Sequence, residues 1–294
     1  MNNNLQWNYP EYYQIEGTGN IDRYDYVYFN DPSMYPEFQN EFIEYKNMLI
    51  DLADQKIDPI SILRYGDGDY YFLTKQAIGS ASPGKRALSV DYSNLSTHDQ
   101  FIDGVCKNDY IATEISPRAR QFFNTLYPNR KIDFPLEFIY GTVANRWIFK
   151  NFNNLKVGII GASEKLYLIE KLLEYPEYQD YIGISDFELI HFPQKFACDD
   201  IDLVENFVGE QLKSGTADVY FVGISSAKLA LLHRFKKYRH ASYIDIGCGI
   251  DALAGCLTTS RPYFFNWTNY RLSDHDYSDI DYMKYKHENE KFLK

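Results

Sequence analysis

The stretch KVGIIGAS, residues 156–163, decides the fold class. Its apolar run over 156–160 is short, contains β-branched residues and ends at Gly161, which is the pattern of a buried strand followed by a turn. Ser163 then stands where it can cap a helix. The apolar positions of that helix share one face: Leu166, Ile169 and Leu173. The stretch therefore predicts one strand and helix unit.

The same unit recurs toward the C-terminus. Apolar runs over 189–192, 219–222 and 242–246 predict three more strands. The helices between them show apolar faces at Val204, Val208 and Leu212, and, after a cap at Ser225 or Ser226, at Ala227, Leu231, Phe235 and Tyr238. This spacing is typical of βαβ units, and continuous apolar strands are buried on both faces. We predict an α/β fold with a Rossmann-like, mostly parallel sheet and helices on both faces.

The first half of the chain is less regular. We expect an irregular arm over 1–35 and a helix over 36–56, where Phe42, Tyr45, Met48, Leu49 and Leu52 have helical spacing. The other expected elements are strands at 60–65, 87–90 and 110–114, helices near 95–106 and 141–151, and a loop region marked by Pro128 and Pro135. The predicted division is an arm and helix over 1–57, a main domain over 58–270 and a polar tail over 271–294.

Composition narrows the function classes. The net charge is −11 and the pI near 5.0, so the field of the protein repels nucleic acid and we expect no nucleic-acid partner. Four widely spaced cysteines form neither a zinc pattern nor a disulfide framework. The N-terminal residues lack the features of a signal peptide, and no apolar run is long enough to cross a membrane. We therefore expect a cytoplasmic protein.

Glycines follow three of the predicted strands. The turns are Gly161-Ala162-Ser163, Gly223-Ile224-Ser225-Ser226 and Gly247-Cys248-Gly249. Ligands of parallel α/β sheets bind at the carboxyl ends of the strands, where glycine lets the backbone approach them. Each glycine also suits an ordinary turn from strand to helix. Together the three turns predict one rim of a ligand-binding site.

The last of these turns suggests a specific alternative. ASYIDIGCGIDALAG, residues 241–255, resembles the cofactor-binding strand of S-adenosylmethionine-dependent methyltransferases. Those enzymes place this strand first, because later units complete the pocket. Here it is the last predicted strand, and the acids about 20 residues onward, Asp274 and Asp276, stand in a loop-like stretch. A permuted methyltransferase stays an alternative.

A second candidate site lies near the start of the predicted domain, where residues 60–73 read ISILRYGDGDYYFL. The strand runs into Asp67 and Asp69, two carboxylates between glycines. Mg²⁺ and Mn²⁺ prefer oxygen ligands and often use one or two carboxylates beside substrate phosphates. The alternative is a Gly-Asp turn whose carboxylates cap the next helix.

This segment resembles the Arg-aromatic-Gly-Asp-Gly-acid motif of the GT-D glycosyltransferases. The similarity continues through KVGIIGAS, ADVYFVGISSAKLALLHRF and YIDIGCGID, over roughly residues 58–256. The resemblance implies one Rossmann-like domain, a nucleotide-diphosphate sugar donor, typically a UDP-sugar, a glycan acceptor, and Mn²⁺ or Mg²⁺ at an Asp-x-Glu motif. Two positions depart from the pattern: Asp69 replaces Glu, and Cys248 stands where the family commonly has His.

The resemblance and the rim argument together give the candidate site residues. The catalytic candidates are Asp67, Asp69, Asp245 and Asp251, of which Asp67 and Asp69 are the metal ligands. The candidates for binding the nucleotide are Arg64, Gly66, Gly68, Gly161, Ser163, Gly223, Ser225 and Gly247.

Several roles stay open. An inverting transferase needs a general base, and the acids in question are Asp91, Glu114, Asp245 and Asp251. Arg146 and Arg261 are further candidates for contacting the diphosphate, with surface ion pairing as the alternative. His191 suits a core or rim position better than a base. The run HRFKKYRH, residues 233–240, fits the solvated end of a helix, and contact with an anionic acceptor is the alternative.

Overall fold

The computed structural model describes residues 38–74, 98–114, 117–144, 146–193, 197–256 and 270–272. The expected strand at 87–90, the N-terminal arm and most of the polar tail lie outside this part of the chain, as do Asp91, Arg261, Asp274 and Asp276. Asp67 belongs to a described helix, but its side chain is also outside the description.

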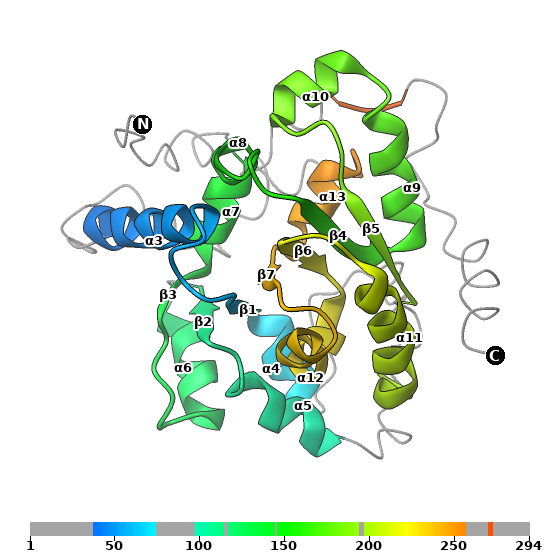
Figure 1. The fold of residues 1–294 in the computed structure, drawn as a ribbon. Coiled ribbons are helices and arrows are strands. Elements are labelled where there is room, and N and C mark those ends of the chain that lie inside the picture. The colour runs from blue at the N-terminus through cyan, green and yellow to red at the C-terminus, as the bar shows by residue number, and fades with distance from the viewer. Residues whose placement is uncertain are drawn as a thin grey trace.

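A seven-stranded parallel sheet forms the centre of the molecule, with the strand order β3-β2-β1-β7-β6-β4-β5 (Figure 1). The strands are β1 (Ser61–Tyr65), β2 (Tyr110–Thr113), β3 (Phe134–Pro135), β4 (Val157–Ala162), β5 (Glu188–Phe192), β6 (Val219–Gly223) and β7 (Ser242–Asp245). Every residue of β4, β6 and β7 is buried, as expected of strands that are covered on both faces.

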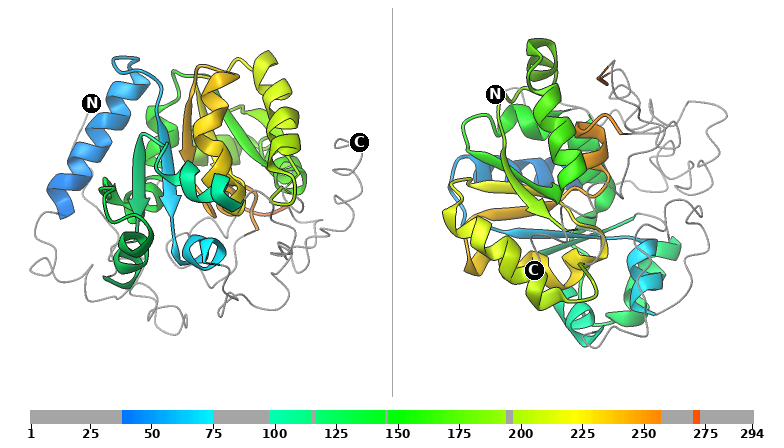
Figure 2. Two further views of the ribbon diagram at one scale, coloured as in Figure 1. Left: turned by 90° about the horizontal axis from the view of Figure 1, so that it is seen from below. Right: turned by 90° about the vertical axis from the view of Figure 1, so that its right-hand side faces the viewer.

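Helices cover both faces of the sheet, as the right-hand view of Figure 2 shows. One layer contains α3 (Phe38–Ala53), α7 (Leu136–Ala144), α8 (Trp147–Asn151), α9 (Ser163–Leu172), α10 (Pro176–Ile182) and α13 (Gly249–Leu253). The other contains α4 (Asp67–Leu73), α5 (His98–Val105), α6 (Pro117–Leu126), α11 (Ile201–Ser214), α12 (Lys228–Leu231) and the 3-10 helix η4 (Leu232–Lys237). The predicted α/β class with a parallel sheet is confirmed.

The pleat of the strands divides the core into two clusters. Ile62 and Ile159 point into the layer with α3 and α9, while their neighbours Leu63 and Ile160 point into the layer with α5 and α11. Alternation of this kind follows from the period of two in a strand.

The predicted helix over 36–56 is present as α3, and its apolar face packs onto the core through Phe42, Tyr45, Leu49 and Leu52. Of the other first-half elements, the strands at 60–65 and 110–114 and the helix near 95–106 are confirmed within two or three residues.

Several local predictions were wrong. The region between Pro128 and Pro135 is not only loop, because 134–135 pair with β2 as a short edge strand. The helix expected near 141–151 begins at Leu136 and is interrupted at Arg146, which has a left-handed φ of 62°. The helices α6 and α10 were not predicted.

The serine caps were also wrong. Ser163 is the first residue of α9, and the preceding Ala162 is the N-cap, without a side-chain hydrogen bond. The expected single helix after Ser225 is instead three short pieces: η3 (Ser225–Ala227), α12 and η4. Neither Ser225 nor Ser226 caps it through its side chain, since the N-cap is Ile224.

All four cysteines are free thiols in the structure. Among the described residues, no helix combines the length and the apolar character that a membrane span requires.

Candidate functional site

β1 and β7 are neighbouring strands that come from opposite ends of the sheet-forming sequence. From β1 the chain proceeds outward to β2 and β3, then crosses to β4 and β5 on the other side and returns through β6 to β7, which pairs with β1. The helices that follow the two strands, α4 and α13, pack in different layers, so the chain leaves β1 and β7 on opposite faces of the sheet. Ligands of open parallel sheets bind beyond the carboxyl ends of the strands. The turn after β1 and the turn after β7 therefore belong to one place, although 181 residues separate Arg64 from Asp245.

The turn after β1 is fixed by one carboxylate. Asp69 is 6% exposed, and its Oδ2 accepts a hydrogen bond of 2.9 Å from the N–H of Gly66, the N-cap of α4. The reciprocal bond from Asp69 N–H to Gly66 O measures 3.1 Å. In a capping box the side chain of the third helical residue accepts the N–H of the N-cap, and Asp69 makes this half of the motif. The alternative that this acid caps the following helix is therefore borne out for Asp69.

The turn after β7 is fixed in the same way by Asp245. This carboxylate is 1% exposed; Oδ1 accepts the N–H of Gly247 at 2.9 Å, and Oδ2 accepts the N–H of Arg64 at 3.2 Å. Gly247 has a φ of 50°, a conformation that glycine adopts without strain. Asp245 thereby ties the end of β7 to β1.

Lys228 joins the two turns. Its side chain is 2% exposed, and Nζ lies 3.1 Å from Asp69 Oδ2, 2.9 Å from Asp245 Oδ2 and 2.6 Å from the carbonyl oxygen of Arg64. Sequence reasoning missed this lysine. The available signal was a lone cation in the apolar run SSAKLALL, where a buried lysine requires a partner.

Arg64 is the second cation of this cluster. Its Nε lies 3.8 Å from Asp245 Oδ2, too far for a hydrogen bond, and this buried nitrogen has no acceptor among the described residues. The guanidinium carbon lies 5.3 Å from the ring centre of Tyr140. Although burial alone would lower it, the nearby Tyr140, Asp245 and Asp69 hold the pKa of Arg64 above its ordinary value. We call Arg64, Asp69, Lys228 and Asp245 the β1/β7 cluster.

The rim glycines have different surroundings. A Cβ at Gly161 would lie 2.1 Å from Ile250 Cδ1, and one at Gly223 would lie 2.7 Å from Ile250 Cγ2. Both glycines therefore make room for α13, and their contact with a nucleotide stays a prediction. At Gly68 a Cβ would have nothing within 4 Å, so this glycine faces open space.

Ser163 and Asp251 belong to neighbouring groups rather than to the β1/β7 cluster. The hydroxyl of Ser163 lies 3.1 Å from Nδ1 of His191, whose pKa is lowered by burial. Asp251 lies 2.7 Å from the Nζ of Lys165, a side chain that is almost fully buried. The partners described for Ser163 and Asp251 lie on β5 and α9, outside the β1/β7 cluster.

The turn after β6 contains Ser225 in a left-handed conformation, with a φ of 52°. The preceding Ile224 has φ −120° and ψ 26°. Successive residues of this kind turn their N–H groups toward one side, an arrangement that binds anions. Cys248, the N-cap of α13, is 9% exposed. Its side chain packs in the core layer that contains α13 and lies close enough to Arg64 to interact with it electrostatically.

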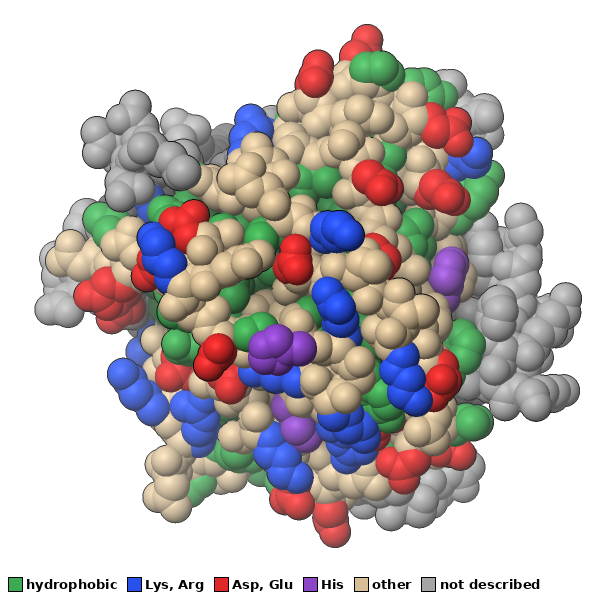
Figure 3. All heavy atoms as spheres, in the orientation of Figure 1, with side chains coloured by type: hydrophobic (Ala, Val, Ile, Leu, Met, Phe, Trp, Pro, Cys, Tyr) green, Lys and Arg blue, Asp and Glu red, His purple; other side chains and the backbone are tan. Residues whose placement is uncertain are grey.

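The other candidates are placed as follows. Glu114 is buried, and its Oε1 would lie 3.8 Å from a Cβ at Gly66, so it borders the cluster. Arg146 stacks on Tyr181 of α10, 4.2 Å from the ring centre. The 233–240 run forms ion pairs: Arg234 contacts Glu205 at 2.8 Å, and Lys236 and Lys237 pair with Asp109 and Glu205. Basic and acidic side chains accordingly lie side by side on the face in Figure 3.

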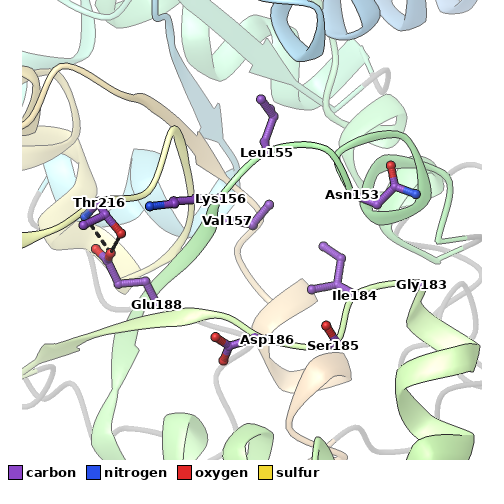
Figure 4. Close-up of a pocket in the computed structure, with 10 residues that line it drawn as sticks. All are labelled: Asn153, Leu155, Lys156, Val157, Gly183, Ile184, Ser185, Asp186, Glu188 and Thr216. Carbon is purple, nitrogen blue, oxygen red and sulfur yellow. Dashed lines mark hydrogen bonds between the residues drawn. The ribbon is translucent and has the colours of Figure 1, made fainter.

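A hollow of about 560 Å³ lies at the amino ends of the strands (Figure 4). We call this end of the sheet the amino edge and the opposite end, where the strands finish, the carboxyl edge. The hollow is lined by the first residues of β4 and the loops that lead into β5 and β6, including Lys156, Asp186, Glu188 and Thr216. Glu188 accepts hydrogen bonds from the N–H and hydroxyl of Thr216 at 2.6 and 3.0 Å. The Glu188 carboxylate is therefore hydrogen-bonded to another residue that lines the hollow.

Comparison of the chain with protein-family models, with curated proteins and with solved structures finds no match.

Proposed function

We propose that the protein is a glycosyltransferase that moves a sugar from a nucleotide-diphosphate sugar, a UDP-sugar in the first instance, to a glycan acceptor. The observation that carries the proposal is the β1/β7 cluster, in which two buried acids and two cations meet at the carboxyl ends of neighbouring strands of a parallel sheet. The motif resemblance of residues 64–69 supplies the reaction class.

The chain offers groups suited to a diphosphate. Arg64 carries a positive charge and a buried N–H without an acceptor among the described residues, and guanidinium groups bind phosphate through paired hydrogen bonds. The left-handed Ser225 supports the same ligand class, because the N–H groups of such a turn bind anions. Gly68, beside open space, lets a bound group approach the start of α4.

A metal ion is part of the proposal, with Asp67 and Asp69 as its protein ligands. Both contacts described for the Asp69 carboxylate use Oδ2, so Oδ1 is the oxygen offered to a cation. The described residues contain no group of three or more acids, histidines or cysteines that forms a metal site by itself. Two aspartates are a suitable protein ligand set for Mg²⁺ or Mn²⁺ when the donor phosphates supply further oxygens. When bound, the ion would neutralise charge on the leaving nucleoside diphosphate.

The candidates for a general base stay Asp91, Glu114, Asp245 and Asp251. We propose to test Glu114 first if the reaction inverts the anomeric centre, because its buried carboxylate borders Gly66 at the start of α4.

A thermal-shift panel tests the proposal. UDP or another nucleoside diphosphate should raise the melting temperature by roughly 5 °C at about 100 times its Kd, in the presence of Mn²⁺ or Mg²⁺ and not with chelator. Asp67→Asn and Asp69→Asn should each abolish the shift. Asp186→Asn, at an exposed position on the opposite edge, is the matched control and should keep it.

The alternatives give different outcomes in the same panel. A shift with S-adenosylmethionine and none with nucleoside diphosphates would establish the methyltransferase alternative instead. No shift with either class, together with no turnover of nucleotide sugars, would leave a non-catalytic sugar-binding module and contradict the proposal.

A further inference from the structure

Lys228 lies where β1, β6 and β7 end, just after the turn that follows β6. An ammonium group has three N–H donors. Here three acceptors lie within hydrogen-bonding or ion-pair distance: Asp69, Asp245 and the carbonyl of Arg64. All three donors of the lysine therefore have acceptors within the protein. This environment suits a counterion rather than a nucleophile or a side chain that binds a ligand directly.

The charges of the cluster balance only if Lys228 is included. Asp69 and Asp245 are 6% and 1% exposed, so water screens neither carboxylate well. Arg64 alone would leave one of the two buried negative charges uncompensated. Removing one partner from a buried ion pair is strongly destabilising for this reason.

The same balance matters for an anionic ligand. The whole protein carries a net charge of −11, and a diphosphate at the carboxyl edge would meet the buried carboxylates of Asp69 and Asp245, with Glu114 at the border of the cluster. Lys228 and Arg64 offset the charges of Asp69 and Asp245. In addition, Asp69 and Asp245 hold the N–H groups of Gly66 and Gly247, so the lysine fixes the two acids that shape both turns.

We propose that Lys228 is a positioning residue for the nucleotide site: it neutralises Asp69 and Asp245 and thereby allows a nucleoside diphosphate to bind between the turns of β1 and β7. This inference rests on the proposed function. It assigns to Lys228 no contact with the ligand.

The experiment compares three variants. Lys228→Met removes the charge and keeps the length of the side chain. Lys228→Met combined with Asp245→Asn removes one charge of each sign, so that Asp69 faces Arg64 alone, and Asn keeps an acceptor for Gly247. Lys213→Met is the control, because Lys213 is an exposed lysine that pairs with Glu210 on α11.

Two quantities are measured at a fixed Mn²⁺ concentration: the melting temperature without nucleotide, and the calorimetric affinity for UDP, UMP and uridine. Lys228→Met should melt roughly 6–20 °C lower, from the cost of an unpaired buried charge. It should bind UDP at least about tenfold more weakly, with a smaller loss for UMP and the smallest for uridine, because the repulsion scales with ligand charge. The double variant should regain much of both losses, and Lys213→Met should match the wild type.

The outcomes separate the two proposals. If Lys228→Met melts like the wild type, or the double variant melts lower still, the counterion role is wrong. If Lys228→Met is less stable but binds UDP with wild-type affinity while folded, the lysine is structural only and the proposed function stands. If Lys228→Met does not fold, the double variant decides: nucleotide affinity close to wild type supports charge balance, and its loss contradicts it. If the wild type binds no nucleoside diphosphate, the proposed function and the positioning role are both overturned.

Discussion

The two edges of the sheet use their acids differently. At the amino edge, four acids accept backbone N–H groups at the starts of strands or in the loops that lead into them: Asp109 from Ser61, Asp133 from Ile111, Asp218 from Lys156 and Glu188 from Thr216. All four are exposed or half-buried. At the carboxyl edge, Asp69 and Asp245 also hold backbone N–H groups, but they are buried and share one buried lysine.

This difference shows which acids to associate with a ligand. A carboxylate that fastens a loop to a strand satisfies backbone donors and needs no further partner. Two buried carboxylates held by cations lie in an environment of low dielectric, where charge acts strongly on whatever approaches. Acids at both edges have a structural role, and only those at the carboxyl edge combine it with buried charge.

After Lys228→Met, the largest expected effect comes from Gly247→Ala. The residue has a φ of 50°, and a Cβ would lie 2.4 Å from Nη2 of Arg64. The variant should lose about 1–3 kcal/mol of unfolding free energy from backbone strain and should bind UDP poorly, because Arg64 must move. Urea denaturation and calorimetry measure the two effects.

Gly183→Ala is the matched control for that variant. Gly183 also has a left-handed φ, 83°, and its Cβ would lie 2.7 Å from the side chain of Lys150, at the amino edge. A comparable loss of stability with unchanged UDP affinity is expected. Equal loss of affinity in both variants would show that the two edges do not differ as described.

A smaller effect is expected for Glu188→Gln at the amino edge. The substitution weakens charged hydrogen bonds to Thr216 and Tyr220 and should cost about 1 kcal/mol of unfolding free energy in urea. The thermal shift with UDP should be unchanged. A lost shift would mean that the hollow at this edge, and not the β1/β7 cluster, contributes to nucleotide binding.

The smallest expected effect is on the pH dependence of the melting temperature. Burial raises the pKa of Glu188 and Asp109, but hydrogen bonds from Tyr220 and Thr216, and from Lys236 and Ser61, outweigh it and hold both pKa values below the ordinary range. The stability that these acids add is present above their unfolded pKa, near 4, and is lost as the pH falls through the lower folded values. Melting temperatures between pH 6 and pH 3 should therefore fall less steeply in Glu188→Gln than in the wild type. Parallel curves would contradict this.

Three strands of the second half could be predicted because each is a short, fully buried and mostly apolar run with a glycine at or just after its end. β4, β6 and β7 all have this form, and only their ends differ by one or two residues from the prediction. The breaks at Arg146 and around Ser225 could not be predicted, because a left-handed φ in a non-glycine residue depends on tertiary contacts.

The candidate site was predictable in part. The approach of Asp245 to Arg64 follows from the parallel sheet once its strands are recognised, since both residues lie at carboxyl ends. The glycines at 161 and 223 follow the same rule, yet they face Ile250, because the helix that follows β7 packs across both strands. Lys228 was missed because its burial depends on how the ends of β1, β6 and β7 come together, which the sequence of one short helix does not reveal.

The pairing of β1 with β7 also affects the order of folding. β1 is synthesised early, but its neighbour β7 is synthesised about 180 residues later. The pairing of these two strands is therefore among the most non-local contacts in the molecule. Until they pair, one side of β1 is an unpaired edge, and the Asp69 carboxylate lacks the lysine that follows β6. Completion of the sheet and assembly of its buried charges are consequently a single late step, and interruptions of synthesis before residue 245 are expected to yield aggregation-prone chains rather than smaller folded domains.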